Sequence, residues 1–396
     1  MKYEVIIITG TKCGGKSTLA RELCHRDSRF MYAKAVTTRS AREDDIPGEY
    51  QYISQVDFEL LLRDKDALIT HATYGNYSYG ICRSEIDNIH KQSKIPVMTI
   101  TPESADKIAG LHRQAGDLTS GQPKYFTVFV DADDSILNDR LELRGVLPNQ
   151  EVIRQRNRDR EFKFVFLLNI HNATIEHTIE LLISLWNHSN IGGVLPARLI
   201  QLMLQCGTLL EGAAISNVSG ASYDLSLGDE YFYRGKIHRL SDSEPILLIE
   251  PYDYAIVTSK ETANFPNDIC ARFDLTVSLF CQGVILSNGP QVDPGFQGPL
   301  FCLLFNTSSS PVMIKRSQHY ATIEFHKLLE PTHSYEGHHR GKRLLHYLPA
   351  NATQGGISEL KKEVEQLRLE SSKLREITWA VLTFLLAIIA VWVSLK

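Results

Sequence analysis

The chain has 396 residues, of which 43% are hydrophobic and 22% are charged, and its formal net charge is −4. At roughly 100–200 residues per domain, this length indicates two or three domains, and the mildly acidic balance gives no reason to expect nucleic acid as a partner. The seven cysteines are scattered and lack C-x-x-C spacing, which argues against a disulfide framework and a zinc site. Because the N-terminus has no long apolar stretch followed by a cleavage site, we expect the folded domains to be cytoplasmic.

The first segment, residues 1–188, alternates short apolar runs with longer periodic stretches. The runs are rich in β-branched residues, as expected of buried strands, and the stretches between them have helical periodicity. Strands that alternate with helices favour an α/β domain whose parallel sheet is covered on both faces. Strands are predicted at residues 5–9, 96–101 and 125–130, and helices at 16–24 and 135–143.

The second segment, residues 189–350, begins with a helix-like stretch at 196–205 and then changes character. Short apolar strings follow one another, broken by Gly, Pro, Asn, Asp and Ser, which is typical of an all-β sandwich or barrel. The strings lie at residues 245–259, 273–280, 298–308, 311–316 and 320–328.

Two features follow near the C-terminus. In residues 357–376, positions that lie alternately three and four apart are mostly apolar, which predicts the seam of a short coiled coil. The alternative is a single amphipathic helix that packs on its own domain. Residues 377–395 include no charge, and at ~1.5 Å per residue this run is about 28 Å long, enough to cross a bilayer core. Trp379 and Trp392 lie near its ends, where aromatic rings are favoured. We therefore expect a single-pass transmembrane helix that acts as a C-terminal tail anchor in a membrane.

Residues 10–17 fit the pattern G-x-x-x-x-G-K-[ST] between an apolar strand and a helix, the context that a phosphate-binding P-loop needs. The glycines let backbone N–H groups surround phosphate oxygens, and the helix N-terminus adds positive potential. Lys16 is expected to reach the β- and γ-phosphates of ATP, and Ser17 to ligate Mg²⁺. The predicted ATP-binding residues are Gly10, Thr11, Lys12, Cys13, Gly14, Gly15, Lys16, Ser17 and Thr18.

Further motifs in the first segment lie at residues 36–42, 48–50, 75–80 and 140–145, with Phe58, Ile153 and Arg156. Together they resemble guanylate kinase and its relatives. The resemblance implies an acceptor-phosphate site at Arg39, Arg42, Tyr50 and Tyr79, and a lid that brings Arg140, Arg144 and Arg156 to the transferring phosphoryl group. Planar guanidinium groups suit phosphate oxygens, so these arginines and Lys16 are the catalytic candidates. Arg158 and Arg160 are expected to be solvated surface charges.

Four positions depart from the guanylate kinase pattern. Thr70 stands where the family reads guanine with a Glu, Ile81 replaces a Thr or Ser, Thr101 replaces a strand-end Asp, and Asp45 replaces a Glu. A carboxylate accepts two hydrogen bonds from guanine, whereas Thr and Ile cannot. We therefore expect an acceptor other than GMP beside Thr70. The Tyr-Gly-Ile sequence that ends at Ile81 also resembles ribose-bisphosphate kinases of the phosphonate pathway, which read no base.

The second segment carries motifs at residues 222–229, 265–269, 278–283 and 292–298, with Asn306 after them. In order and spacing they resemble the dCTP deaminase and dUTPase superfamily. The resemblance implies a distorted β-barrel or jelly-roll that forms homotrimers with sites shared between subunits. It also implies a nucleotide site at Asp224, Asp293, Phe296 and Gln297.

The chemistry of that superfamily is not expected here. The resemblance places Leu303 where deaminases carry a proton-shuttling Glu, and leucine cannot move protons. Val277 and Cys281 stand where a Ser and an Arg would cradle phosphates. Asp293 matches the Asp that positions water in dUTPases, but an Asp in a D-P-G turn also serves a turn hydrogen bond. Residues 335–342 have the outline of the family's C-terminal phosphate lid, or form a basic loop.

Three functions follow from these patterns. The first is an ATP-dependent kinase for a nucleoside monophosphate or a similar small phosphorylated acceptor, fused to an inactive nucleotide-binding trimer. The second is a membrane-anchored nucleotide sensor or effector with little turnover. The third is a structural scaffold. The intact Lys16 and Ser17 and the lid arginines favour the first.

Overall fold

A parallel sheet with strand order β2-β7-β1-β8-β9 forms the centre of the N-terminal domain. The computed structural model describes residues 3–394 apart from 42–44, 46, 75, 116–124, 189–191, 288–290, 330, 338–339, 347 and 349–356. The strands of this sheet are β1 (Val5–Gly10), β2 (Phe30–Tyr32), β7 (Ile95–Thr99), β8 (Tyr125–Asp131) and β9 (Leu168–His171). The parallel α/β domain predicted from the sequence is confirmed.

Alternate residues of β1 face two different hydrophobic layers, because successive side chains of a strand point to opposite faces. Ile6 and Ile8 belong to the layer under α1 (Lys16–Arg26) and α7 (Ile175–Asn187). Val5 and Ile7 belong to the layer under α3 (Arg83–Lys91) and α4 (Pro102–Ala115). All residues of β1 are buried, as expected for a central parallel strand.

Two smaller parts complete this domain. One is a four-stranded sheet with the order β4-β3-β6-β5. Helix α2 follows β4 in the chain, and its N-cap Ser54 accepts a hydrogen bond from the Asp57 N–H. The other is the lid, residues 134–161, which holds two helices. The elements are β3 (Ala35–Thr37), β4 (Tyr50–Tyr52), α2 (Gln55–Arg63), β5 (Leu68–Tyr74), β6 (Tyr77–Cys82), α5 (Asp134–Glu142), α6 (Gln150–Glu161) and η1 (Lys163–Val165).

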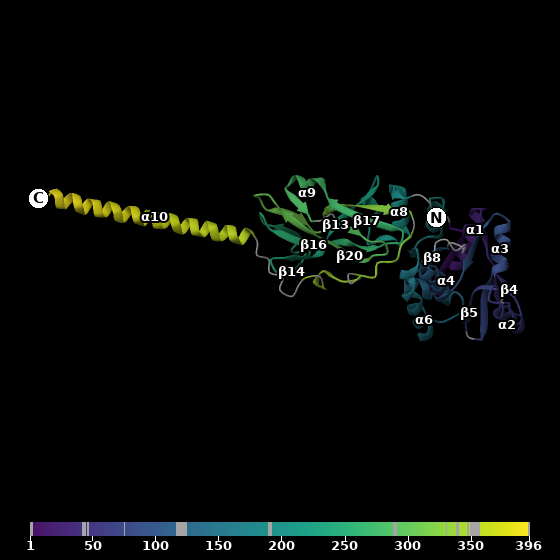
Figure 1. Ribbon diagram of the computed structural model, residues 1–396. Coiled ribbons are helices and arrows are strands. Elements are labelled where there is room, and N and C mark those ends of the chain that lie inside the picture. Colours follow the sequence, from purple (N-terminus) through teal and green to yellow (C-terminus); the bar gives the residue numbers. More distant parts are fainter. Residues whose placement is uncertain are drawn as a thin grey trace.

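The second domain is β-rich, as predicted and as Figure 1 shows. Its strand path is β18-β20-β16-β13-β22-β17-β19, with a separate β15–β21 pair. Burial alternates along its strands, as in a sheet with one face in the core. Its strands are β10 (Gly193–Val194), β11 (Leu209–Glu211), β12 (Val218–Ser219), β13 (Ser222–Tyr233), β14 (Lys236–Arg239), β15 (Ile246–Ile249), β16 (Tyr254–Asn264), β17 (Ile269–Leu275), β18 (Val284–Leu286), β19 (Gln291–Val292), β20 (Gln297–Asn306), β21 (Val312–Lys315) and β22 (His319–Lys327). Its helical segments are α8 (Ala197–Gln205), η2 (Ile215–Asn217), α9 (Val277–Cys281) and η3 (Leu344–His346).

One expected strand is wrong in part. The apolar string at 273–280 was predicted to continue as a strand, but the pairing of β17 with β22 ends at Leu275 and the chain turns into α9. Val277 and Phe280 on this helix are 75% and 68% exposed. Phe273 and Leu279 of the string are buried, while Val277 and Phe280 are not, so hydrophobicity alone gave the wrong element.

A tight joint connects the two domains. Helices α7 and α8 contribute to one continuous hydrophobic cluster that spans both. The backbone N–H of His171, at the end of β9, donates to the carbonyl oxygen of Cys206 at 3.0 Å. Gly207 follows with φ +71°, and a Cβ at this position would lie 3.0 Å from the carbonyl oxygen of His171. Only glycine therefore fits at this contact without strain.

The C-terminal segment forms one helix, α10 (Ile357–Ser394), that projects away from both domains in Figure 1. Leu367 and Leu374 of the expected seam are 63% and 65% exposed. The segment therefore does not pack on its own domain, and its association into a coiled coil over 357–376 stays a prediction.

The membrane span expected over 377–395 is not supported. Among the residues that the structure describes, no helix is both long and apolar enough to cross a bilayer. Residues 395–396 lie outside the described residues, and the cytoplasmic location of the domains stays a prediction.

The joint gives a prediction for stability. Gly207→Ala should lower the free energy of unfolding by about 2–4 kcal/mol, because it adds both left-handed strain and crowding against His171. Gly212→Ala is the matched control: Gly212 has φ +73° but open space around its Cβ position, so only the strain of about 1–2 kcal/mol is expected. Urea unfolding of both variants measures the difference, and equal losses would show that the joint is not crowded.

Candidate functional site

The predicted P-loop connects β1 to α1 and lies against the end of β8. A Cβ at Gly10 would sit 1.9 Å from the carbonyl oxygen of Val130, so the close approach requires glycine. Lys16 Nζ donates to the carbonyl oxygens of Gly10 (2.9 Å) and Thr11 (2.8 Å). Desolvation lowers the pKa of Lys16. The lysine thus lies folded onto the loop, within the place where phosphate oxygens would bind.

Ser17, the predicted Mg²⁺ ligand, has a buried carboxylate as its partner. Its Oγ donates to Glu49 Oε1 at 2.7 Å, and Glu49 is 8% exposed. Because the hydroxyl hydrogen is directed at Glu49, the lone pairs of the oxygen remain free for a cation. Mg²⁺ in phosphoryl-transfer sites needs few protein oxygens beside those of the nucleotide. These residues therefore fit the ion.

One cavity of about 640 Å³ begins at the P-loop and extends to the four-stranded sheet. Its volume lies within the range of small-molecule sites. The predicted site residues that line it are Gly10, Lys12, Lys16, Ser17, Arg39, Tyr50, Thr70 and Tyr79. The structure thus brings the predicted ATP end and the predicted acceptor end into one space.

Arg39 lines the cavity at its predicted acceptor end. It is 7% exposed, its guanidinium forms an ion pair with Asp45, and it lies 4.9 Å from the ring centre of Tyr50. The rings of Tyr50 and Tyr79 are edge-to-face at 6.3 Å. A phosphate would bind here by taking the place of the Asp45 carboxylate. Arg42, the other predicted acceptor arginine, lies outside the described residues.

The cavity wall next to Arg39, Tyr50 and Tyr79 contains residues that depart from the guanylate kinase pattern. Thr70 and Ile81 pair across β5 and β6, and both line the cavity together with Thr101. Among the described lining residues, the carboxylates are those of Glu151 and Asp159, and both come from the lid. The wall that would face an acceptor base is therefore built of hydroxyl and methyl groups.

The lid arginines occupy three different positions. Arg140 Nη1 donates to the carbonyl oxygen of Cys13 in the P-loop at 3.2 Å. Arg144 is close enough to Lys16 to contribute to its lowered pKa, after the larger effect of desolvation. Arg156 is 1% exposed and donates to Asn138 Oδ1 at 2.6 Å, while its Nε and Nη2 have no partner among the described residues. Two such buried donors are costly unless an anionic ligand supplies acceptors.

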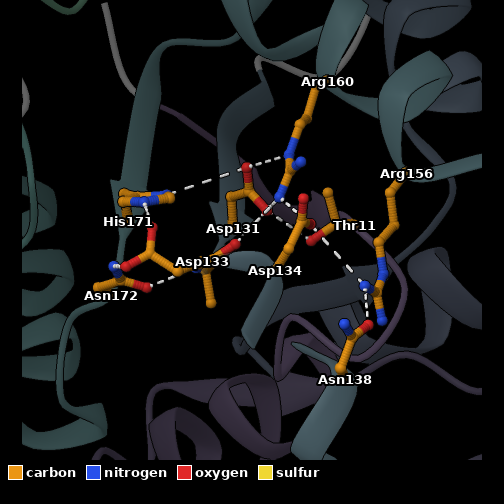
Figure 2. Close-up of polar contacts among 10 residues, drawn as sticks. Thr11, Asp131, Asp133, Asp134, Asn138, Arg156, Arg160, His171 and Asn172 are labelled. Carbon is orange, nitrogen blue, oxygen red and sulfur yellow. Dashed lines mark hydrogen bonds and ion pairs between the residues drawn. The ribbon is translucent and has the colours of Figure 1, made fainter. Parts of the chain in front are cut away.

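The expectation that Arg160 is a solvated surface charge is wrong. Its side chain is 25% exposed and bonds to Asp131 (Nε to Oδ2, 2.9 Å) and to Asp134 (2.9 Å), as Figure 2 shows. Although desolvation opposes it, the hydrogen bonds to both carboxylates raise the pKa of Arg160. Arg158 is exposed, as predicted, and bonds to Gln155. No local pattern could distinguish the two arginines, because Asp131 is 29 residues away.

In the second domain the residues predicted to bind a nucleotide lie in two separate places. Asp293, Phe296 and Gln297 share one turn, in which the Phe296 N–H donates to the Asp293 carbonyl at 3.1 Å. Gln297 Nε2 donates to Asn264 Oδ1 at 2.9 Å. Asp224 lies elsewhere, on β13, where it accepts a hydrogen bond from Thr322 on β22.

The structure also shows where the residues lie that replace the catalytic and phosphate-binding side chains of deaminases. Leu303 lies within β20, while Val277 and Cys281 lie on α9 and are exposed. Leucine and valine cannot transfer a proton, and none of the three side chains carries a positive charge that could bind a phosphate. The Asp293 turn is closed by a main-chain hydrogen bond, while the Asp293 side chain accepts from Gln291 Nε2 at 3.2 Å. The interpretation that this Asp serves a turn hydrogen bond stays a prediction.

Comparison with known proteins shows what the N-terminal domain is similar to. The guanylate kinase family model matches residues 2–188. The guanylate kinase of Mycoplasmopsis pulmonis is 28% identical over 185 residues, which cover 45% of this chain and 91% of that protein.

The family model described as dCTP deaminase-like matches residues 195–328. The dCTP deaminase of Pyrococcus horikoshii is 32% identical over 138 residues, covering 35% of this chain and 87% of that protein. That of Thermococcus kodakarensis is 34% identical over 138 residues, covering 35% and 88%. Both resemblances read from the sequence are thereby confirmed. Through residues 195–328 the chain belongs to the dCTP deaminase-like family, and residues 2–188 before them are similar to guanylate kinases.

Proposed function

We propose that the N-terminal domain transfers the γ-phosphate of ATP to a small phosphorylated acceptor, either a nucleoside monophosphate or a compound of similar size. The observation that carries this proposal is the single cavity that joins the P-loop to Arg39, Tyr50 and Tyr79. Phosphoryl transfer requires mainly that donor and acceptor phosphates be held in line within a positively charged site. Lysine at one end and arginine at the other meet that requirement.

The chain's own groups have distinct tasks in this proposal. Lys16 leaves the carbonyl oxygens of the loop and neutralises the β- and γ-phosphates, since its two present contacts are neutral acceptors. Arg140, already beside Cys13, and Arg144 add charge from the lid side. Bound Mg²⁺, held through Ser17, would supply further charge neutralisation on the phosphate oxygens. Arg156 offers two unpartnered donors to the same negative charge once the lid closes.

The acceptor is proposed to be something other than GMP. Thr70, Ile81 and Thr101 line the wall where a base would lie, and none can accept the paired hydrogen bonds of guanine. Hydroxyl groups on this wall suit a sugar or a small polar group instead.

For the second domain we propose nucleotide binding without deamination, in a homotrimer. The domain belongs to the dCTP deaminase-like family. Leu303, Val277 and Cys281, however, stand where that family has a proton-shuttling Glu and a phosphate-binding Ser and Arg. Residues 293–297 and the segment near Gly341, whose N–H donates to the Gln297 carbonyl at 2.9 Å, are the parts that would hold a nucleotide.

A nucleotide sensor with little turnover is the second candidate function. It is favoured by the joint between the domains, because the His171 N–H donates to the Cys206 carbonyl oxygen across it and both domains contribute to one hydrophobic cluster. A change of shape in either domain would therefore reach the other through this joint. The membrane part of this idea has no support in the structure.

The kinase proposal predicts the outcome of one substitution. Lys16→Ala should lower kcat/KM for transfer from ATP to the acceptor by at least about 100-fold, because a charge aimed at the transition state is lost. Lys91→Ala, which removes an exposed lysine on α3, should leave the rate unchanged. Radiolabelled ATP and a panel of nucleoside monophosphates and sugar phosphates provide the assay. Equal rates for the wild-type protein and Lys16→Ala would contradict the proposal.

Acceptor choice gives a further prediction. GMP should be a poor acceptor, and Thr70→Glu should raise kcat/KM for GMP by about tenfold or more, since a carboxylate hydrogen bond contributes about 1.5–3 kcal/mol. Thr73→Glu, at an exposed position of the same strand, is the control and should have no effect. Efficient phosphorylation of GMP by the wild-type protein would refute the specificity argument and leave the kinase proposal intact.

The second domain should release no ammonia from dCTP, because Leu303 cannot shuttle protons. Leu303→Glu alone should not restore the reaction, since Val277 and Cys281 still lack phosphate-binding groups. An ammonia assay, run beside the deaminase of Pyrococcus horikoshii as the positive control, decides this. Ammonia release by the wild-type chain would overturn it.

A further inference from the structure

The carboxylate of Asp131 connects the P-loop to the lid (Figure 2). Asp131 ends β8 and is 7% exposed. Its Oδ1 accepts hydrogen bonds from Thr11 Oγ1 at 2.8 Å and from the Ala132 N–H at 2.9 Å. Its Oδ2 accepts from Arg160 Nε at 2.9 Å. One buried carboxylate is therefore shared by the first turn of the P-loop and by the last turn of α6.

The burial of the Asp131 carboxylate costs free energy. Burying a carboxylate is unfavourable unless charge and hydrogen bonds compensate. Here the hydrogen bonds come from the P-loop and the lid, and His171 Nδ1 lies 3.9 Å from Asp131 Oδ2. Arg160 strengthens the link, because its Nη2 also donates to the Ala132 carbonyl (3.1 Å) and to Asp134 (2.9 Å). The C-terminal half of α6 is thus held on β8 and on the start of α5.

Both partners of Asp131 lead directly to the cavity. The carbonyl oxygen of Thr11 accepts a hydrogen bond from Lys16 at 2.8 Å, so the position of Thr11 determines where the lysine rests. On the other side, Val152, Gln155 and Asp159 of α6 line the cavity. A shift of Asp131 would displace the phosphate-binding lysine and the lid wall together.

We propose that Asp131 is a positioning residue for phosphoryl transfer: it sets the P-loop through Thr11 and the lid through Arg160 without contacting substrate. This inference rests on the proposed kinase function and deepens it. Asp131 holds the two binding surfaces at a fixed separation, so that ATP bound on one meets the charges carried by the other.

The two contacts are separable by substitution. Thr11→Val, which removes the hydroxyl and keeps the shape, should raise KM for ATP by about tenfold and retain kcat. Arg160→Gln should lower kcat by about tenfold to a hundredfold and retain KM, since hydrogen bonds to charged groups are worth factors of this size. Asp131→Asn keeps an acceptor oxygen for Thr11 but presents an NH₂ group to Arg160, so it should resemble Arg160→Gln. Asp131→Ala should combine both losses.

Two control variants lie close to these residues. Arg158→Gln removes an arginine on the same helix that bonds to Gln155, and Asp133→Asn alters an exposed carboxylate near Asp131 that bonds to His171 and Asn172. Both should keep wild-type kcat and KM. If Asp133→Asn reproduces the behaviour of Asp131→Asn, or if Asp131→Asn leaves both constants unchanged, the proposal is wrong. Thermal unfolding of each variant identifies any that fail to fold, and Asp131→Asn, which keeps the side-chain shape, remains usable if Asp131→Ala does not fold.

Two measurements test the inference apart from turnover. Calorimetric titration with ATP should show weaker binding to Thr11→Val and unchanged binding to Arg160→Gln. Amide hydrogen exchange in α6 should rise in Arg160→Gln and Asp131→Asn but not in Arg158→Gln. If the wild-type chain phosphorylates no acceptor while both results hold, the kinase function fails and the positioning role stands. If neither result holds, the positioning role fails whatever the activity.

Discussion

The nucleotide loop of this protein rests directly on the end of a neighbouring strand. The carbonyl oxygen of Val130 accepts the Thr11 N–H at 3.2 Å, and Cβ atoms at Gly10 and Gly14 would lie 1.9 and 2.9 Å from it. Backbone therefore touches backbone, which requires glycine on the loop side. The next residue of that strand, Asp131, anchors the lid. A single strand end thus determines the positions of the loop, the lid helix α6 and the cavity between them.

Short sequence motifs predicted the parts of this site that depend on neighbouring residues in the chain. The glycines and Lys16 could be read from spacing, and the strand at β1 from five consecutive apolar or β-branched residues, because burial on both faces leaves a continuous apolar run. The contacts of Ser17 with Glu49 and of Arg160 with Asp131 join residues 32 and 29 positions apart. A sequence shows a charge at such positions but not its partner, and so Arg160 was taken for a surface charge.

The second domain keeps its fold through buried contacts that owe nothing to deamination. Glu261 is 1% exposed and accepts hydrogen bonds from Tyr223 Oη at 3.1 Å and from the Ser226 N–H at 3.0 Å. These bonds join β13 to β16 inside the core, where an unpaired carboxylate would be strongly unfavourable. Turn residues and alternation predicted this β-rich domain but not helix α9, because Val277 and Phe280 continue the apolar string although they are exposed. The fold is therefore maintained by residues different from those that the family's chemistry needs.

The contact between Gly207 and His171 also bears on how such a protein is inherited. The two contacting residues lie within their own domains, on either side of the linker, so neither domain carries the whole joint. A recombination event that cut the gene at the linker and supplied a different second domain would bring another residue opposite His171. Any side chain there would meet the carbonyl oxygen at 3.0 Å. Exchange of one module thus requires a matching glycine in the incoming one, which favours transmission of the two domains as a single unit.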